Sequence, residues 1–399
     1  MTPERAVIVG ASHAGAQLAA NLRREGWSGE VVLIGDEGGL PYHRPPLSKG
    51  YLAGKNGLDD LLIRGADFYE KQHIRLLNAT VEAIHRSAKR VSLSTGDTLT
   101  YTKLALCTGA RARRLPTPGV DLPGIHYLRT AADVELIRAA ATPGRRVVIV
   151  GGGYIGLETA ASLCSLGMNV TVLEATERVL ERVTAPEVSA FYTRIHNGEG
   201  VEIRTHALVE AFSGNGRVQE VVLAGGEPIP ADLVIVGVGV VPNTELASAA
   251  GLSVDNGIVI DDQARTSDPD IVAAGDCTSH TMARYGSRIR LESVSSAGEQ
   301  AKIAAATICG KHSAIAALPW FWSDQYDLKL QIAGLNTGYD EVVFSGDPSR
   351  DRDFSCFYFR EGELIAADCV NRPRDFMSSK RAISQQLRVD RSELLAGSI

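Results

Sequence analysis

The chain has 399 residues, of which 44% are hydrophobic, and a formal net charge of −6. At roughly 150 residues per domain, this length predicts two to three domains. The negative charge and the lack of a basic tail argue against binding to nucleic acid. No run of about 18 apolar residues predicts a membrane span, and the N-terminal residues do not resemble a signal peptide. We therefore expect a cytoplasmic protein that binds neither nucleic acid nor a membrane.

The first predicted elements lie in 6-AVIVGASHAGAQLAANLRREGWSGEVVLIGDE-37. A β-branched strand is followed by a glycine-rich turn, a helical pattern and a second apolar strand, which is one βαβ unit. The turn is Gly10-x-Ser12-x-x-Gly15, in which Ser12 replaces the middle glycine of a dinucleotide-binding turn and could bond a phosphate through its hydroxyl. The acid after the second strand is Asp36 or Glu37, and the sequence does not choose between them.

A proline-rich stretch, 41-PYHRPPLSK-49, follows this unit. Pro45 and Pro46 each remove an N–H donor and push the preceding residue out of the helical region, so we expect a stiff loop and no helix. Arg44 and Lys49 add two cations. Taken alone, such a stretch is more often a solvated surface turn.

A second βαβ unit lies in 147-VVIVGGGYIGLETAASLCSLGMNVTVLEATE-177. Its turn is Gly151-x-Gly153-x-x-Gly156, whose glycines allow a tight turn, a close approach to pyrophosphate and helix–strand packing. Glu174 closes the second strand, where a carboxylate can bond ribose hydroxyls and repel a 2′-phosphate. Arg178 and Arg182 lie nearby, but we read them as cations of a solvated face and expect NADH.

Later segments predict further strands at 104–110, 232–243 and 271–277. From about Leu318 the composition becomes aromatic, 354–359 and 364–370 alternate like antiparallel strands, and 373–386 reads as a helix. Two dinucleotide sites on one chain suit a bound flavin that accepts hydride from a diffusible nicotinamide. Asp276 ends a strand where it could meet the ribityl chain of FAD, although it is equally well explained as a turn acid.

We therefore expect an α/β protein with two Rossmann-like domains and a C-terminal α+β domain. Because the stretch 271–277 continues the sheet of the first unit, the FAD domain is predicted to be discontinuous. The predicted boundaries are 1–109 and 237–317 for the FAD-binding domain, 110–236 for the NADH-binding domain and 318–399 for the C-terminal domain.

The six cysteines indicate neither a metal site nor a disulfide framework. None is spaced Cys-x-x-Cys, and none clusters with histidines at metal-ligand spacing. We expect buried, reduced thiols and no metal. No cysteine precedes Cys107, so redox-active thiols on the proline-rich loop are excluded.

Five stretches, GDE-x(3)-PYHRPPLSKGYLAG, GGGYIGLE, VIVGVGVVPN, IVAAGDC and PWFWSDQ, span nearly the whole chain. In this order they resemble the FAD-dependent NADH:ferredoxin reductases of bacterial oxygenase systems. That family has a glutathione-reductase-like fold and includes the reductases of putidaredoxin, of rubredoxin and of biphenyl dioxygenase. Ser12 departs from its pattern and leaves the phosphate contacts of FAD open.

The resemblance implies roles for the loop and its partners. Arg44 would face the pyrophosphate and ribityl side of FAD, Lys49 would lie near the reactive edge of the flavin, and Glu158 could reach Lys49. Glu158 is also explained as an acid of the first helical turn. Trp320 either abuts the flavin or belongs to the C-terminal core. The FAD-binding residues expected in this way are Gly10, Ser12, Gly15, Asp36, Glu37, Arg44, Pro45, Lys49, Thr108, Gly109, Asp276 and Trp320.

The expected activity is electron transfer from NADH through FAD to a small iron–sulfur protein. The resemblance implies a [2Fe–2S] ferredoxin, or alternatively a rubredoxin, that serves a dioxygenase or a monooxygenase such as a cytochrome P450. Two other activities stay open, an NADH oxidase and a redox-signalling flavoprotein of the apoptosis-inducing-factor type. A basic docking surface is expected from Arg64, Arg290, Arg372, Arg374, Lys380 and Arg381.

Overall fold

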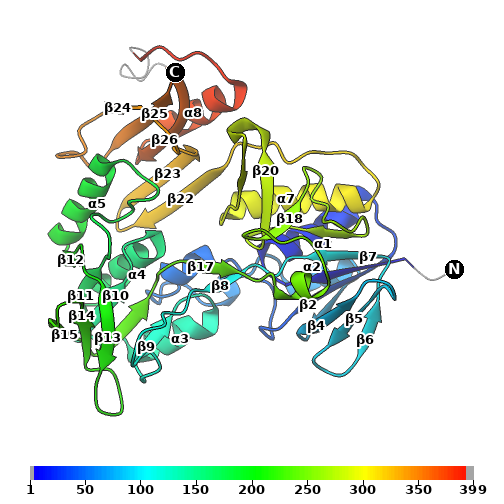
Figure 1. Cartoon of the computed structure of the whole chain (residues 1–399), viewed down its shortest axis with the longest axis horizontal. Coiled ribbons are helices and arrows are strands. Elements are labelled where there is room, and N and C mark those ends of the chain that lie inside the picture. The colour runs from blue at the N-terminus through cyan, green and yellow to red at the C-terminus, as the bar shows by residue number, and fades with distance from the viewer. Residues whose placement is uncertain (1–3, 392–399) are drawn as a thin grey trace. The chain divides into compact units, whose positions relative to one another are not determined.

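The structure is a computed structural model that describes residues 4–391, and these residues form two compact units. The first unit contains residues up to His43, Asp59–Arg111 and Val241–Pro319. The second contains Arg44–Leu58, Ala112–Val240 and the residues from Trp320 onward. The chain therefore leaves and re-enters each unit, which the colour ramp of Figure 1 lets the reader follow.

A five-stranded parallel sheet forms the centre of the first unit. Its inner strands are largely buried runs of valine, isoleucine, leucine and alanine, as is typical of parallel sheets covered on both faces, whereas the edge strand β3 is mostly exposed. Helices α1 (His13–Glu25) and α7 (Val294–Ile308) pack against each other beside it. In spatial order the strands are β19 (Ile271–Ala273), β7 (Lys103–Leu106), β1 (Arg5–Val9), β2 (Glu30–Gly35) and β3 (Ile74–Asn78).

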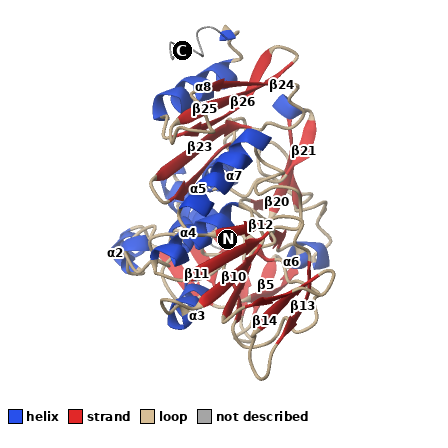
Figure 2. Ribbon diagram, turned by 90° about the vertical axis from the view of Figure 1, so that its left-hand side faces the viewer, coloured by secondary structure: helices blue, strands red, loops and turns tan. Residues whose placement is uncertain are grey.

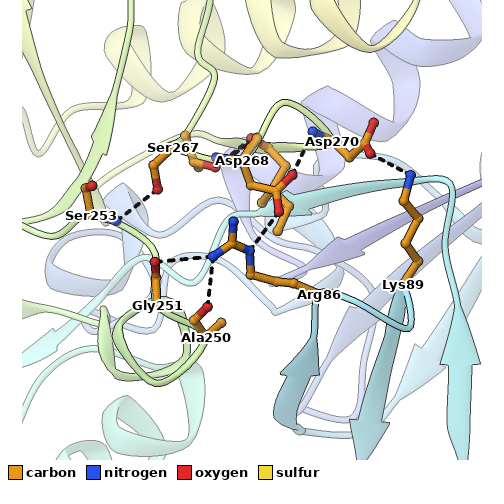
Figure 3. A network of polar contacts seen from close by, with 10 residues as sticks. Arg86, Lys89, Ala250, Gly251, Ser253, Ser267, Asp268 and Asp270 are labelled. Atoms are coloured by element: carbon orange, nitrogen blue, oxygen red, sulfur yellow. Dashed lines mark hydrogen bonds and ion pairs between the residues drawn. The ribbon is translucent and has the colours of Figure 1, made fainter.

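An antiparallel sheet and a mixed sheet, each of three strands, complete this unit, and ion pairs join its sequence-distant parts. The turn after β4 carries Arg86, whose Nε donates to Asp268 at 2.7 Å, and Lys89, whose Nζ donates to Asp270 at 2.6 Å (Figure 3). Both acids lie in the loop before β19, so residues almost 200 positions apart belong to one folded unit. The elements are β4 (Val81–His85), β5 (Arg90–Leu93) and β6 (Thr98–Thr100), and β18 (Ile258–Ile260), β20 (Thr278–Met282) and β21 (Ser287–Ile289).

The second unit repeats this arrangement with a second parallel sheet. It is accompanied by helices α3 (Ala131–Ala140), α4 (Tyr154–Ser165) and α5 (Pro186–Gly198). The strands are β12 (Glu202–Arg204), β11 (Asn169–Leu173), β10 (Arg146–Val150), β16 (Leu233–Val236) and β9 (Ile125–Tyr127), with an antiparallel meander of β13 (Val209–Ser213), β14 (Glu220–Leu223) and β15 (Pro228–Pro230).

The C-terminal residues add an antiparallel sheet to the second unit, and helix α8 (Pro373–Gln385) packs on it (Figure 2). Both predicted strands and the predicted C-terminal helix are confirmed. The sheet order is β22 (Trp320–Gln325), β23 (Leu328–Gly334), β26 (Glu363–Val370), β25 (Phe354–Arg360) and β24 (Glu341–Ser345). The remaining short elements are α2 (Ala66–Lys71), α6 (Glu245–Ala249), β8 (Ala110–Ala112) and β17 (Val240–Pro242).

The proline-rich stretch differs from the prediction of a loop without helix. Residues Pro45–Ser48 form a short 3₁₀ helix, η1, whose first two positions are the prolines. At these positions the missing N–H groups would have had no intrahelical acceptor, so proline is tolerated there. Among the described residues no helix is both long and apolar enough to cross a membrane.

Candidate functional site

The first glycine turn has the geometry of a dinucleotide-binding turn. Gly10 has a φ of +107°, and a Cβ there would lie 2.1 Å from the carbonyl oxygen of Cys107. A Cβ on Gly15 would lie 1.9 Å from the carbonyl oxygen of Gly10, so the start of α1 packs directly on the end of β1. Ser12 is the N-cap of α1, but its side chain does not cap the helix. The turn therefore keeps its backbone shape with serine in the middle.

Predicted FAD residues lie where the strands of the first sheet end. Gly10 follows β1, Thr108 follows β7 and Asp276 follows β19, so all three lie at the carboxyl edge, where ligands of open α/β sheets bind. Asp36 and Glu37 follow β2 at the same edge. Glu37 accepts a hydrogen bond from the hydroxyl of Tyr42. The tight glycine turn and this convergence fit an FAD.

Two amides that the sequence analysis missed hold this edge together. Asn243 donates from Nδ2 to the backbone carbonyl oxygen of Thr108 at 2.8 Å. The backbone carbonyl oxygen of Asn243 in turn accepts from Thr108 Oγ1 at 2.6 Å. The backbone N–H of Asn243 donates to the carbonyl oxygen of Gly109. Gln300 Oε1 accepts from the N–H of Gly275 at 2.7 Å. Asn243 ends the stretch VIVGVGVVPN and had a signal in the sequence, whereas Gln300 lies inside a helix and had none.

Thiol chemistry has no support at this edge. Cys107 and Cys277 are buried, and burial raises the pKa of both thiols. The six cysteines are free in the structure. No cluster of three or more potential metal ligands occurs among residues 4–391. The residues support a bound flavin without a thiol relay.

The second glycine turn repeats the geometry of the first. Gly151 has a φ of +111°, and its Cβ would lie 2.4 Å from the carbonyl oxygen of Gly237. A Cβ on Gly156 would lie 2.0 Å from the carbonyl oxygen of Gly151. By contrast, nothing lies within 4 Å of the Cβ position of Gly153, the N-cap of α4. This open space at a helix N-terminus is where a pyrophosphate fits.

Glu174 braces the second turn. Its Oε2 accepts a hydrogen bond from the N–H of Gly152 at 2.8 Å, and its Oε1 accepts from the N–H and hydroxyl of Thr176, each at 2.9 Å. A carboxylate has about four acceptor positions, so one remains for a ribose hydroxyl. The predicted contact with NADH stays a prediction, and the bond to the turn is an additional role.

The nearby arginines differ in what they can bind. Arg178 donates to the carbonyl oxygens of Thr184 and Glu181 and to the hydroxyl of Ser189, at 2.6–3.0 Å. Its guanidinium is therefore committed to the protein and not placed for a 2′-phosphate. Arg182 is exposed.

Lys49 and Glu158 form an ion pair. Lys49 Nζ lies 2.7 Å from Glu158 Oε2, and the two side chains are 19% and 4% exposed. The same carboxylate accepts from Ser48 Oγ at 2.5 Å and from Ser323 Oγ at 2.7 Å. Glu158 is the fifth residue of α4, so its alternative explanation as a first-turn acid is wrong. Its partners come from two other segments of the second unit, η1 with its cap and β22.

Further bonds fix the segment that carries Lys49. Ser162 Oγ of α4 donates to the carbonyl oxygen of Ser48 at 2.8 Å, and Lys49 Nζ also donates to the carbonyl oxygen of Pro45 at 3.0 Å. Arg44 Nη1 donates to the carbonyl oxygen of Arg129 at 2.8 Å. The lysine is therefore preorganised. The predicted contacts of Arg44 and Pro45 with FAD stay predictions.

Trp320 lies in an aromatic cluster of the second unit. Its ring stacks on Trp322 with centroids 5.5 Å apart, and Lys380 Nζ lies 4.7 Å from its centroid. Burial lowers the pKa of Lys380. These contacts belong to the C-terminal domain, and the predicted contact of Trp320 with FAD stays a prediction.

The predicted docking cations fall into two groups. Arg64 and Arg290 belong to the first unit, where Arg64 lies over the ring of Phe68 and Arg290 is paired with Glu292. The other four lie at or on α8 of the second unit. Arg372 is paired there with Asp353. The basic residues left on α8 are Arg374, Lys380 and Arg381.

Comparison with known proteins gives one consistent result. Residues 4–301 match the pyridine nucleotide-disulphide oxidoreductases, and residues 320–398 match the reductase C-terminal domain. Putidaredoxin reductase of Pseudomonas putida is 47% identical over 97% of this chain and 93% of its own length. A ferredoxin–NAD(P)(+) reductase of a Sphingomonas species is 45% identical over 96% and 94%. The crystal structure of a covalent putidaredoxin reductase–putidaredoxin complex superposes with a TM-score of 0.95, at 45% identity and 99% coverage of both chains.

Proposed function

The chain belongs to the pyridine nucleotide-disulphide oxidoreductase family, and from this premise we propose that it is an FAD-dependent NADH:ferredoxin reductase. When bound, FAD supplies the chemistry that accepts a hydride from NADH and releases electrons one at a time. The observation that carries the proposal is the Lys49–Glu158 pair. Lys49 lies on the proline-rich stretch 41–49, where the redox cysteines of a disulfide reductase would have to lie.

The first unit is proposed to bind FAD at the carboxyl edge of its sheet. Gly10 and Gly15 bring the backbone within reach of a pyrophosphate, and Asn243 and Gln300 hold the strand ends in place. Asp276 supplies a carboxylate for the ribityl hydroxyls. These groups bind and orient the cofactor by position, with no covalent bond to it.

The second unit is proposed to bind NADH. The open space beside Gly153 receives the pyrophosphate at the N-terminus of α4, and Glu174 accepts from the adenosine ribose. Because Arg178 is committed to protein acceptors, a 2′-phosphate would meet the carboxylate of Glu174 without the guanidinium of Arg178 as a partner. We therefore propose a preference for NADH.

Lys49 is proposed to be the charged group beside the reactive edge of the flavin. A preorganised ammonium stabilises negative charge that develops there on hydride transfer, and it needs no reorganisation at that moment. Glu158, Ser48 and Ser162 fix the segment that presents it. Its bond to Glu158 holds the ammonium in one position.

The electron acceptor is proposed to be a [2Fe–2S] ferredoxin of an oxygenase system. The structural relative was solved as a complex of a reductase with putidaredoxin, which supports an acceptor of that kind. On α8, Arg374 and Arg381 are exposed, and the neighbouring Met377 is 62% exposed. A basic surface around an apolar residue suits the acidic surface of a small ferredoxin.

Acceptor specificity tests this function. Purified protein reconstituted with FAD is mixed with NADH in a stopped-flow instrument, in the presence of a [2Fe–2S] ferredoxin, a rubredoxin or air. We expect one FAD per chain and ferredoxin reduction much faster than reoxidation in air. Equal reoxidation in air with and without ferredoxin identifies an oxidase, and slow turnover with every acceptor plus a long-lived reduced complex identifies a signalling flavoprotein. Protein that cannot take up FAD would contradict the whole proposal.

Charge reversal tests the docking surface. Arg374→Glu with Arg381→Glu is expected to lower the second-order rate of ferredoxin reduction about tenfold at low salt, because complementary charge accelerates association. The loss is expected to shrink at high salt. Arg350→Glu is the control, because Arg350 is exposed on the loop between β24 and β25 and does not belong to α8. A rate independent of ionic strength would contradict an electrostatic docking surface.

A further inference from the structure

A buried chain of hydrogen bonds runs from Glu158 to Tyr326 within the second unit. Ser323 Oγ donates to Glu158 Oε1 at 2.7 Å, and Gln325 Nε2 donates to Ser323 Oγ at 3.1 Å. His196 Nε2 lies 2.8 Å from Gln325 Oε1, and the hydroxyl of Tyr326 lies 3.1 Å from His196 Nδ1. Glu158, Ser323, Gln325 and His196 are each at most 3% exposed. Buried polar groups that all find partners in this way form a rigid network.

The chemistry of the groups sets the direction of every hydrogen bond. Gln325 Oε1 only accepts, so His196 must carry its proton on Nε2. A neutral imidazole then accepts at Nδ1, and Tyr326 donates to it. Burial lowers the pKa of His196 to about 4, so the ring is neutral at physiological pH. All four hydrogens therefore point towards the carboxylate.

The carboxylate needs such donors. Burial raises the pKa of Tyr154 on α4 and of Tyr192 on α5, and the charge of Glu158 contributes to both shifts, so these phenols face it unionised. Asp368 of β26 acts on the same two tyrosines, and burial raises its pKa to about 7. Lys49 is the cation that contacts Glu158. Lys49 and the hydroxyls of Ser48 and Ser323 therefore supply the charged and polar contacts of the Glu158 carboxylate.

We propose that Ser323, Gln325 and His196 are positioning residues that hold the carboxylate of Glu158 against Lys49. Ser323 acts directly on the carboxylate, while Gln325 and His196 orient Ser323. Hydrogen bonds aligned in one direction polarise one another, so the remote members strengthen the bond at Glu158. The amide of Gln325 neither takes up nor releases a proton in the physiological range, so the chain is a brace and does not conduct protons. In this way the C-terminal domain, which supplies Ser323, Gln325 and Tyr326, positions the carboxylate that Lys49 binds.

The inference rests on the proposed role of Lys49 but is tested by a property of Glu158 alone. The FAD-loaded protein is titrated with acid while the infrared band of the protonated carboxyl is recorded, and Glu158→Gln identifies the band. Ser323→Ala is expected to raise the pH of half-protonation by about one unit, because a hydrogen bond to the charged form is lost. Gln325→Leu is expected to raise it by less. The midpoint potential of FAD, plotted against pH, is expected to change slope at the shifted pH.

Ser355→Ala is the matched control. Ser355 is as buried as Ser323 and donates to Asp375 of α8 at 2.7 Å, so the substitution removes an equivalent hydroxyl from the same sheet. It is expected to leave the titration of Glu158 unchanged, and Ser323→Thr, which keeps the hydroxyl, is expected to restore the wild-type value. Unchanged titration in both Ser323→Ala and Gln325→Leu would overturn the proposal. A shifted titration in a protein that reduces no ferredoxin would sink the proposed function and leave the brace in place.

Discussion

The two βαβ units share a backbone and differ in the side chains placed on it. Gly10 and Gly151 have nearly the same φ, and the last glycine of each turn touches the carbonyl oxygen of the first. Two residues after that glycine, however, α1 carries Gln17 and α4 carries Glu158. Only the carboxylate forms an ion pair with the segment that carries Lys49. The same fold therefore serves two dinucleotides. The residue two positions after the last glycine, Gln17 in α1 and Glu158 in α4, determines which helix carries a carboxylate.

The acids after the second strands differ in a similar way. Glu174 bonds back to the N–H of Gly152 in its own turn, whereas Asp36 is exposed and Glu37 accepts from Tyr42. The acid of the second unit is thus part of the turn it serves. A diffusible nicotinamide must bind and dissociate, and a turn fixed by a hydrogen bond keeps its shape while the site is empty. This agrees with the proposal that FAD stays bound to the first unit while NADH exchanges at the second.

The largest effect is expected from the first glycine of each turn. Gly151→Ala places a Cβ 2.4 Å from a backbone carbonyl and requires alanine at a φ of +111°. We expect a loss of about 3 kcal/mol or more in the free energy of unfolding, measured with denaturant. Gly10→Ala should cost as much in the first unit, where the clash is at 2.1 Å.

Gly153→Ala is the control for this pair. Its Cβ has no neighbour within 4 Å and its φ is −79°, so stability is expected to stay within about 0.5 kcal/mol while the KM for NADH rises. Equal destabilisation by Gly151→Ala and Gly153→Ala would show that the two positions do not have the separate roles assigned here.

The next effect separates the two helices. Glu158→Gln gives α4 the residue that α1 has and removes the anion bound by Lys49, while Lys49→Met removes the cation. We expect Lys49→Met to retain FAD and to slow reduction by NADH about a hundredfold, since a single preorganised electrostatic group contributes about 2–4 kcal/mol. Stopped-flow absorbance of FAD measures the rate. Loss of FAD instead of rate would make Lys49 a binding residue.

The acids after the second strands should show a smaller difference. Glu174→Ala removes an acceptor for ribose and the brace on Gly152, and the KM for NADH is expected to rise about tenfold, equivalent to about 1.4 kcal/mol. Glu174→Arg is expected to shift the preference towards NADPH. Asp36→Ala, measured in parallel, should change FAD content and leave the KM for NADH unaltered. A wild-type preference for NADPH would contradict the role of Glu174.

The smallest effect concerns an ion-paired aspartate next to the sheet of each unit, Asp232 in the second unit and Asp270 in the first. A hydrogen bond from Arg146 lowers the pKa of Asp232 to about 2, and Lys103 and Lys89 lower the pKa of Asp270. A lowered folded-state pKa stabilises the protein above the unfolded value of about 4 and loses that contribution as the pH falls towards 2. Asp232 is one-third exposed, so Asp232→Asn should cost less than about 1 kcal/mol at pH 7. Denaturation at pH 7 and pH 3 should show that the difference in free energy of unfolding between the wild type and Asp232→Asn is smaller at pH 3. An equal difference at the two pH values would contradict the link between this pKa and stability.

The sequence by itself determined both βαβ units, the strands at 354–359 and 364–370 and the helix from Pro373. These follow from hydrophobic periodicity and from glycines whose φ or close approach excludes other residues, and such constraints act over a few neighbouring positions. The glycine turns were located in the same way. The sequence did not predict the 3₁₀ helix at Pro45–Ser48, because proline was treated as a helix breaker. Proline is tolerated at the first two positions of a helix, where Pro45 and Pro46 lie.

Only the tertiary structure decided what the polar groups do. Glu158 meets Ser48 and Ser323, which lie 110 and 165 positions away, and Glu174 bonds a backbone N–H rather than standing free. Nothing in the spacing of serine, glutamine and histidine marks the chain that ends at Tyr326. A hydrogen bond between distant segments depends on a few tenths of an ångström and on an angle, so it is fixed only when the segments are packed together. Burial of an apolar face has no such directional requirement, so a periodic sequence pattern is enough to predict it.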